Sequence, residues 1–194
     1  MLDGAACGFF GKIPARGDFV RAGLPRSFVE PWDAWLQAVL AGSRALLGAG
    51  WLPAWLEAPI WRFALAPGIA GPDSVLGLWV PSVDRAGRHF PLTLACVAPG
   101  GTAAALQESG GAWLDAVERI GLAALEQDTP PETIAEQLRA AAPACALHAA
   151  PEQAATRWWT EGGPFVVSRR MALPGLPDAP GFAAMLSDAA EPRA

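Results

Sequence analysis

The sequence lacks the features by which membrane and secreted proteins are usually recognised. No stretch of roughly 18 apolar residues is free of charge, proline and glycine, so a membrane-spanning helix is not expected. The N-terminus has an early acidic residue and no apolar segment behind a basic flank, which argues against a secretory signal. Cysteine is scarce, and Cys7, Cys96 and Cys145 are widely spaced. This pattern favours buried thiols in a reducing compartment over a disulfide framework, so the expected location is the cytoplasm.

Positive charge and metal-ligand clusters are also in short supply. The formal net charge is −5, which disfavours nucleic acid as the main partner, and Lys12 is the single lysine. Cys145 and His148 are spaced like two metal ligands, but no second pair follows at zinc-site spacing. We therefore expect neither a metal nor a cofactor.

Apolar residues are abundant. The 194 residues are 52% hydrophobic and include nine tryptophans, which is enough to build one domain around an aromatic core. The sequence contains no internal repeat and no long linker. We expect residues 1–194 to form a single domain, with a disordered tail over the last few residues, from Glu191 onward.

The spacing of apolar residues predicts several strands. Trp61, Phe63 and Leu65 alternate with smaller or polar residues, as in a strand. A second and a third strand flank the polar turn 82–89, and the short connections predict an antiparallel meander. Two more strand predictions are a first strand at 7–13 and a hairpin from Trp158-Trp159 through the turn 161–164 to 165–168.

Helical spacing alternates with these strands. A long amphipathic helix is predicted from Phe28 to Leu47, with Ser27 and Glu30 as a capping box. Further helical segments are predicted at 51–57, 102–127 with an interruption near Gly110, 132–142 and 182–186. The pattern indicates an α/β fold with a mixed, largely antiparallel central sheet and helices packed over it.

The polar chemistry is concentrated in two loops, 11–18 and 82–89. Ser82, Asp84 and His89 are the residue types of a hydrolytic triad, which makes a small hydrolase or ligand-binding enzyme the alternative function. The three residues lie within eight positions, however, and no Gly-x-Ser-x-Gly elbow surrounds the serine. A structural network, in which the serine or the aspartate accepts backbone N–H groups and an arginine pairs with a carboxylate, fits the spacing better.

Two other local patterns are better explained by structure than by function. Gly11-Lys12 is followed by Ile13-Pro14 and lacks the preceding glycine of a phosphate-binding loop. The tryptophan pairs at 32 and 35 and at 51 and 55 have helical spacing and predict core packing. Trp158 and Trp159 face opposite ways on a strand, so one of them is a candidate for an exposed contact with a partner.

Four phrases of the sequence resemble a known family. They are GFFGKIPARGDFVRAGLPRSFVEPWDAWLQ, WRFALAPG, GLWVPSVDRAGRHFPLTL and RWWTEGG, which follow one another over nearly the whole chain. They are similar to the TagF (ImpM) family of type VI secretion accessory proteins, although Thr156-Arg157 stands where the family often has Ser-Leu. Some members carry a fused phosphatase domain, which this sequence lacks.

The resemblance implies a single three-layer α/β/α sandwich and a non-enzymatic function. Members of the family act in the cytoplasm as post-translational repressors of type VI secretion, through the forkhead-associated scaffold protein, and have no established catalytic residues. The positions that match the family motifs are candidates for partner binding or for folding, and they are Lys12, Pro14, Gly17, Asp18, Pro81, Ser82, Asp84, Gly87, Arg88 and Phe90.

The two polar loops are expected to lie side by side. Charged groups at strand ends need local partners when they are partly buried. Our hypothesis is that Asp18 and Asp84 pair with Arg85, Arg88 or Lys12.

Overall fold

The computed structural model describes residues 5–98, 111–126, 129–141 and 155–190. Seven strands form one sheet in the order β2-β1-β5-β4-β3-β6-β7. The strands are β1 (Ala6–Gly11), β2 (Val20–Ala22), β3 (Trp61–Leu65), β4 (Ser74–Val80), β5 (Leu92–Ala98), β6 (Thr156–Thr160) and β7 (Arg169–Leu173). The α/β fold and the meander of β3, β4 and β5 are confirmed. The sheet is not mixed: all pairings among the described strands are antiparallel, and four of the six join strands that follow one another in the chain.

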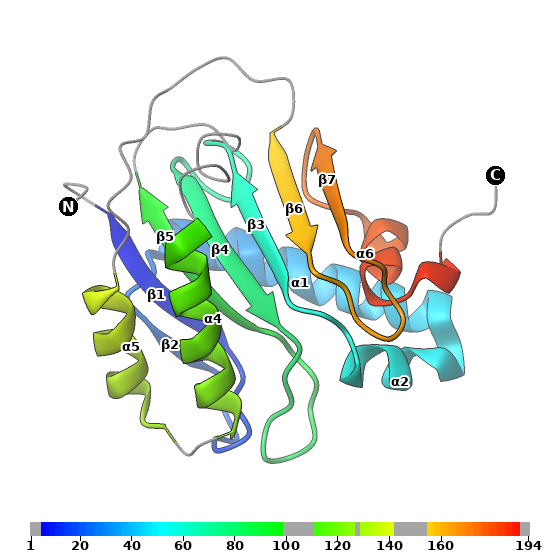
Figure 1. The fold of residues 1–194 in the computed structure, drawn as a ribbon, viewed down its shortest axis with the longest axis horizontal. Helices are drawn as coiled ribbons and strands as arrows, with labels where there is room; N and C mark the ends of the chain where they lie inside the picture. The colour runs from blue at the N-terminus through cyan, green and yellow to red at the C-terminus, as the bar shows by residue number, and fades with distance from the viewer. Residues whose placement is uncertain (1–4, 99–110, 127–128, 142–154, 191–194) are drawn as a thin grey trace.

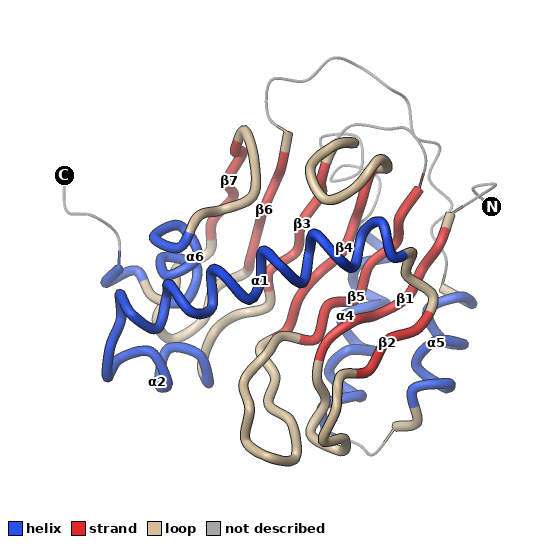
Figure 2. The backbone as a smooth tube through the Cα atoms, turned by 180° about the vertical axis from the view of Figure 1, so that it is seen from behind, coloured by secondary structure: helices blue, strands red, loops and turns tan. Residues whose placement is uncertain are grey.

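Helices cover both faces of this sheet, which gives three layers. Figure 1 shows α4 (Gly111–Glu126) and α5 (Pro131–Ala140) in front of the sheet. Figure 2 shows α1 (Arg26–Leu47) crossing the opposite face. The remaining helical elements are η1 (Gly48–Gly50), α2 (Trp51–Leu56), α6 (Ala179–Leu186) and η2 (Asp188–Ala190). None of the helices in the described part of the chain is long and apolar enough to cross a membrane.

Each face of the sheet has its own hydrophobic core. The core under α1, α2 and α6 is aromatic, with Trp32, Trp61 and Phe182 fully buried. The core under α4 and α5 is mainly aliphatic, with Leu78 and Leu94 among its members. The central strands β4 and β5 are buried along their whole length because they lie between these cores.

The prediction that Trp158 or Trp159 is exposed is wrong. Trp158 and Trp159 do face opposite sides of β6, but both are buried, at 0% and 7% exposure. Trp158 belongs to the aromatic core and Trp159 to the aliphatic one. Neither indole is free to contact a partner, because each packs into the core on its own face of the sheet.

The long helix α1 begins differently from the expectation. Its N-cap is Pro25, in an extended conformation with ψ 148°, and no side chain caps the helix. The Pro25 carbonyl accepts the N–H groups of Phe28 and Val29, so Ser27 lies inside the first turn and cannot be the cap. Glu30 instead accepts hydrogen bonds from Arg26, 3.0 Å from Nε and 2.6 Å from Nη2. The capping-box prediction was therefore wrong, although the helix was placed correctly.

The last part of the chain forms longer elements than the sequence predicts. The second strand of the hairpin is β7, and residues 165–168 belong to the connection, which Gly163 N–H closes on the Val166 carbonyl at 2.8 Å. The final helix begins at Ala179, where the Asp178 side chain accepts the Gly181 N–H. The predicted helical residues 102–110 and the tail from Glu191 lie outside the described residues.

Candidate functional site

The two polar loops meet at one end of the sheet. One loop, residues 12–19, leaves β1, and the other, residues 81–91, joins β4 to β5. β1 and β5 are antiparallel neighbours, with Phe10 opposite Thr93, so the end of β1 lies beside the start of β5. The Arg85 N–H donates to the Arg16 carbonyl at 3.1 Å and ties the loops together. We call residues 12–19 and 81–91 the two-loop corner, and its formation confirms the expected proximity.

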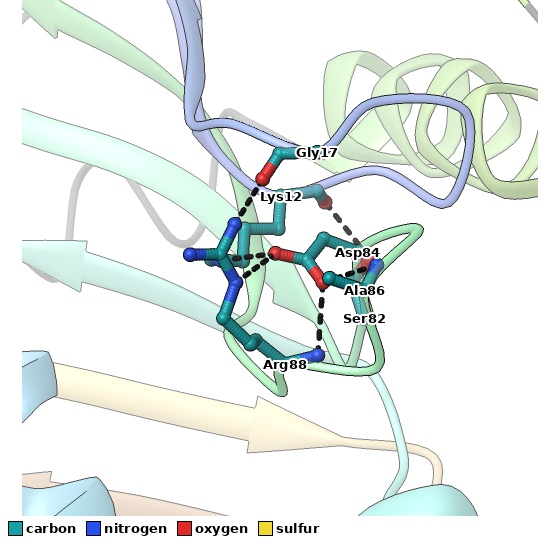
Figure 3. Close-up of polar contacts among 6 residues, drawn as sticks. All are labelled: Lys12, Gly17, Ser82, Asp84, Ala86 and Arg88. Atoms are coloured by element: carbon teal, nitrogen blue, oxygen red, sulfur yellow. Dashed lines mark hydrogen bonds and ion pairs between the residues drawn. The ribbon is translucent and has the colours of Figure 1, made fainter.

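Asp84 is the centre of this corner. Its side chain is fully shielded from solvent. One carboxylate oxygen, Oδ2, pairs with Lys12 Nζ and accepts from Arg88 Nε at 2.7 Å. The other, Oδ1, accepts the backbone N–H groups of Ala86 and Arg88, each at 2.9 Å. Figure 3 shows the carboxylate enclosed by these donors from both loops.

These contacts decide the charge of Asp84. Burial disfavours the carboxylate and by itself raises its pKa, but the hydrogen bonds from Lys12, Arg88 and Ala86 outweigh burial. The pKa of Asp84 is therefore held well below its ordinary value of 3.8. A carboxylate that is ionised, buried and saturated with donors serves to hold two loops together, and it has no proton to exchange near neutral pH.

Ser82 links the corner to the rest of the fold. Its Oγ donates to the Lys12 carbonyl at 2.8 Å. Its own carbonyl accepts the Phe90 N–H at 3.1 Å and Trp55 Nε1 at 3.3 Å. Ser82 thus joins the end of β1, the base of the 81–91 loop and helix α2, and its hydroxyl points at backbone.

Glycine and proline shape both loops. Gly87 has φ +81° and donates its N–H to the Asp84 carbonyl at 2.9 Å, which makes the tight turn around the carboxylate. The Gly17 carbonyl accepts from Arg88 Nη2, which fastens the second loop to the first. Pro14 lies in a turn closed by a hydrogen bond from Arg16 N–H to the Ile13 carbonyl, at 3.1 Å.

The proposed pairing is confirmed for Asp84 and wrong for Asp18. Lys12 and Arg88 are the partners of Asp84, as two of the expected alternatives. Asp18 is exposed and has no ion pair among the described residues. An exposed carboxylate is stabilised by water and needs no ion pair. Arg85 contributes its backbone N–H to the corner while its side chain is exposed.

An aromatic cluster supports the corner. Phe90 is buried and packs edge-on against Phe10 and Phe19, at centroid distances of 5.8 and 4.8 Å. Phe19 also stacks on Phe10 and lies under Lys12 Nζ, 4.9 Å from the ring centroid. Phe19 is nevertheless 47% exposed. Sequence reasoning did not single it out, although the phrase Gly-Asp-Phe-Val contains it.

The hydrolytic triad is not assembled. Among the described residues, no hydrogen bond joins Ser82 to His89 or His89 to Asp84. The His89 ring packs edge-on against Trp51 and Trp55, and its pKa is lowered by burial and by Arg44, against the raising effect of Asp84. The hollow beside Ser82 holds about 70 Å³ and is lined by neither His89 nor Asp84. This arrangement favours the structural network over the enzyme alternative.

The larger hollows lie away from the corner. One of about 530 Å³ lies between β7 and α6, and one of about 540 Å³ lies between α4 and α5. Neither is lined by a residue predicted for the site. The described residues contain no group of three or more potential metal ligands, and the Cys145–His148 pair falls outside them.

The corner also has a solvent-exposed face. Its buried charges are mutually satisfied, while three residues are exposed: Arg85, Phe19 and Arg88, whose side chain is 59% exposed although it is bound to Asp84. Exposed aromatic and arginine residues are enriched in protein–protein contacts.

Comparisons with known proteins agree with this geometry. Residues 8–141 match the model of a family described as the TagF N-terminal domain, type VI secretion system-associated. The match includes the whole two-loop corner. No curated protein matches the sequence.

A solved structure extends the likeness to the rest of the chain. The crystal structure of PA0076 from Pseudomonas aeruginosa PAO1 is similar with a TM-score of 0.86 and 36% sequence identity. The alignment covers 97% of this chain and 96% of PA0076. It therefore includes β6, β7 and α6, which follow the region matched by the family model.

Proposed function

The chain belongs to the TagF family of type VI secretion-associated proteins, and we propose that it is a cytoplasmic, non-enzymatic repressor of that secretion system. We propose further that it acts after translation, by binding the forkhead-associated scaffold of the system. The family match supports the secretion role. The scaffold as partner is what the motif resemblance implies.

One observation supports contact over catalysis. The residues that match the family motifs are used to build the two-loop corner: Ser82 and Asp84 are buried and hydrogen-bonded within it. What the corner leaves for another molecule is an exposed face of Arg85, Arg88 and Phe19. A face of this kind binds a surface and offers no enclosed space in which to transform a substrate.

We infer that the chain acts as one domain. β6 follows α5 in the sequence, yet it pairs with β3 in the same seven-stranded sheet. α6 packs on α1, and both helices cover the aromatic core. The elements after residue 155 are therefore integrated with those before residue 98.

The proposal is tested with the purified chain and the purified scaffold protein from the same genome. We expect a stable one-step binding curve in biolayer interferometry, and reduced release of secreted substrates when the chain is overproduced in the cell. Absence of binding, together with secretion at the normal level on overproduction, would contradict the proposal. A rival enzymatic role predicts turnover of model esters that Ser82→Ala abolishes.

A further inference from the structure

Two of the three cysteines face each other across neighbouring strands. Cys7 on β1 and Cys96 on β5 are direct partners in the antiparallel register. Neither is in a disulfide, and both belong to the aliphatic core. No local pattern in the sequence indicates this pairing, because 88 residues separate the two positions and the register comes from the fold.

The geometry of this pair suits a disulfide. Directly opposed residues of antiparallel strands have Cα atoms about 4.5 or 5.5 Å apart, depending on the hydrogen-bonding position. Disulfides in proteins join Cα atoms that are about 4.4–6.8 Å apart. The Cα separation expected for Cys7 and Cys96 as directly opposed residues therefore lies within the range that a disulfide spans.

The two thiols also interact in the reduced state. A hydrogen bond with Cys96 lowers the pKa of Cys7, against the raising effect of burial. Cys7 is the more accessible of the two, at 7% exposure against 3% for Cys96. Cys96 lies directly opposite Cys7 on the neighbouring strand, in the position of a resolving thiol.

We propose that Cys7 and Cys96 form a dithiol site that hydrogen peroxide converts reversibly into an intramolecular disulfide. The Cys7 thiolate attacks one peroxide oxygen, the O–O bond breaks, and water leaves after protonation, so that Cys7 becomes a sulfenic acid. The Cys96 sulfur then attacks the Cys7 sulfur, the S–O bond breaks, and a second water carries away the Cys96 proton. Each sulfur loses one electron and peroxide gains two. Small thiols reverse the reaction by exchange.

The bridge joins two strands that carry the corner. β1 leads into loop 12–19, and β5 receives loop 81–91. A covalent link between these strands fixes their register, independently of the charges around Asp84. The site is separate from the secretion role proposed above and does not depend on it.

The test uses the full chain with Cys145→Ser, so that the two opposed cysteines are the only ones present. After graded peroxide in native buffer, we expect an intact mass lower by two hydrogen atoms, simultaneous loss of both titratable thiols, and recovery of both with dithiothreitol. Peptide mapping should recover a Cys7–Cys96 cross-link. In the matched control, Cys96→Ser in the same background, oxidation should stop at added oxygen on Cys7.

Three results would overturn the proposal. The first is addition of oxygen to Cys7 without a bridge while Cys96 is present. The second is a bridge that appears only in denaturant, where the register is lost. The third is two thiols that stay fully titratable under peroxide in the folded protein.

Discussion

Asp84 is a buried carboxylate that stabilises the fold only while it is ionised. Its pKa is lower in the folded chain than the ordinary value of 3.8 that applies to the unfolded chain. The unfolded chain therefore binds a proton first as the pH falls, so Asp84 stabilises the fold above about pH 4 and this contribution is lost below it. His89, whose pKa is also lowered, acts in the same direction below about pH 6.5.

The acid limb of stability should consequently depend on Asp84. We expect the melting temperature of the wild-type chain to fall steeply between about pH 4 and pH 2, and that of Asp84→Asn to start lower and fall less over this range. Asp18→Asn is the matched control, since Asp18 is an exposed aspartate of the same corner, and it should keep the wild-type slope. An unchanged slope in Asp84→Asn would mean that the carboxylate does not carry the acid sensitivity.

The two cations beside Asp84 should contribute unequally. The Lys12 side chain is 5% exposed, whereas the Arg88 side chain is 59% exposed, so water screens the charge of Arg88. Lys12→Met should lower the free energy of unfolding by about 3 kcal/mol, because it leaves a buried charge short of a partner. Arg88→Ala should lower it by under about 1 kcal/mol. Urea unfolding of both variants measures the difference, and equal losses would contradict the burial argument.

Residue identity predicted the corner only in part. The types and spacing of Lys12, Asp84 and Arg88 pointed to a charge network, and burial then selected these partners from the alternatives. Asp18 and Arg85 carry the same charges but stay in water, and no local pattern in the sequence separates a buried carboxylate from an exposed one. The role of Phe19 in the corner was not predicted, because it depends on contacts with Phe10 and Phe90 that only the fold creates.

At the scale of elements, the turn around Asp84 depends on one glycine. Gly87 has φ +81°, a conformation that L side chains rarely adopt, and no other atom crowds the position of a Cβ there. Gly87→Ala should therefore lower the free energy of unfolding by about 1 kcal/mol through backbone strain alone. Gly17→Ala is the control, because Gly17 is also uncrowded and has no positive φ. It should change stability by less than about 0.5 kcal/mol. Equal effects of the two substitutions would refute the strain argument.

Strand β6 shows why pattern alone misjudged exposure. Alternation correctly put Trp158 and Trp159 on opposite faces, but only the tertiary structure shows that a core packs against each face. Trp159→Ala should lower the free energy of unfolding by about 3 kcal/mol or more, as loss of a core indole does. Val167→Ala, at a residue 63% exposed, should be within about 0.5 kcal/mol of the wild type. A stable Trp159→Ala chain with weakened scaffold binding would restore the contact hypothesis.

At the scale of the whole molecule, local periodicity predicted elements better than it predicted their neighbours. The β3–β4–β5 meander followed from short connections, and the long helix followed from the three-and-four spacing of Trp32, Leu36 and Val39. The pairing of β1 with β5 and of β6 with β3 joins distant segments, and neither is encoded in any short stretch. The position of the two-loop corner, and the meeting of Cys7 with Cys96, both follow from the first of these pairings.

We propose that the buried charges build the corner and that its exposed groups bind the secretion scaffold. Arg85 separates these functions, since its backbone belongs to the corner while its side chain is exposed. Arg139 is a matched control, an exposed arginine in the last turn of α5. Both charge reversals, Arg85→Glu and Arg139→Glu, should leave the melting temperature close to that of the wild type.

The most direct measurement is the dissociation constant of the chain for the forkhead-associated scaffold, compared between these two variants. We expect Arg85→Glu to weaken binding by at least about tenfold, as removal of an interface arginine does, and Arg139→Glu to bind like the wild type. Equal affinities for the wild type and Arg85→Glu would contradict the assignment of the corner as the binding surface.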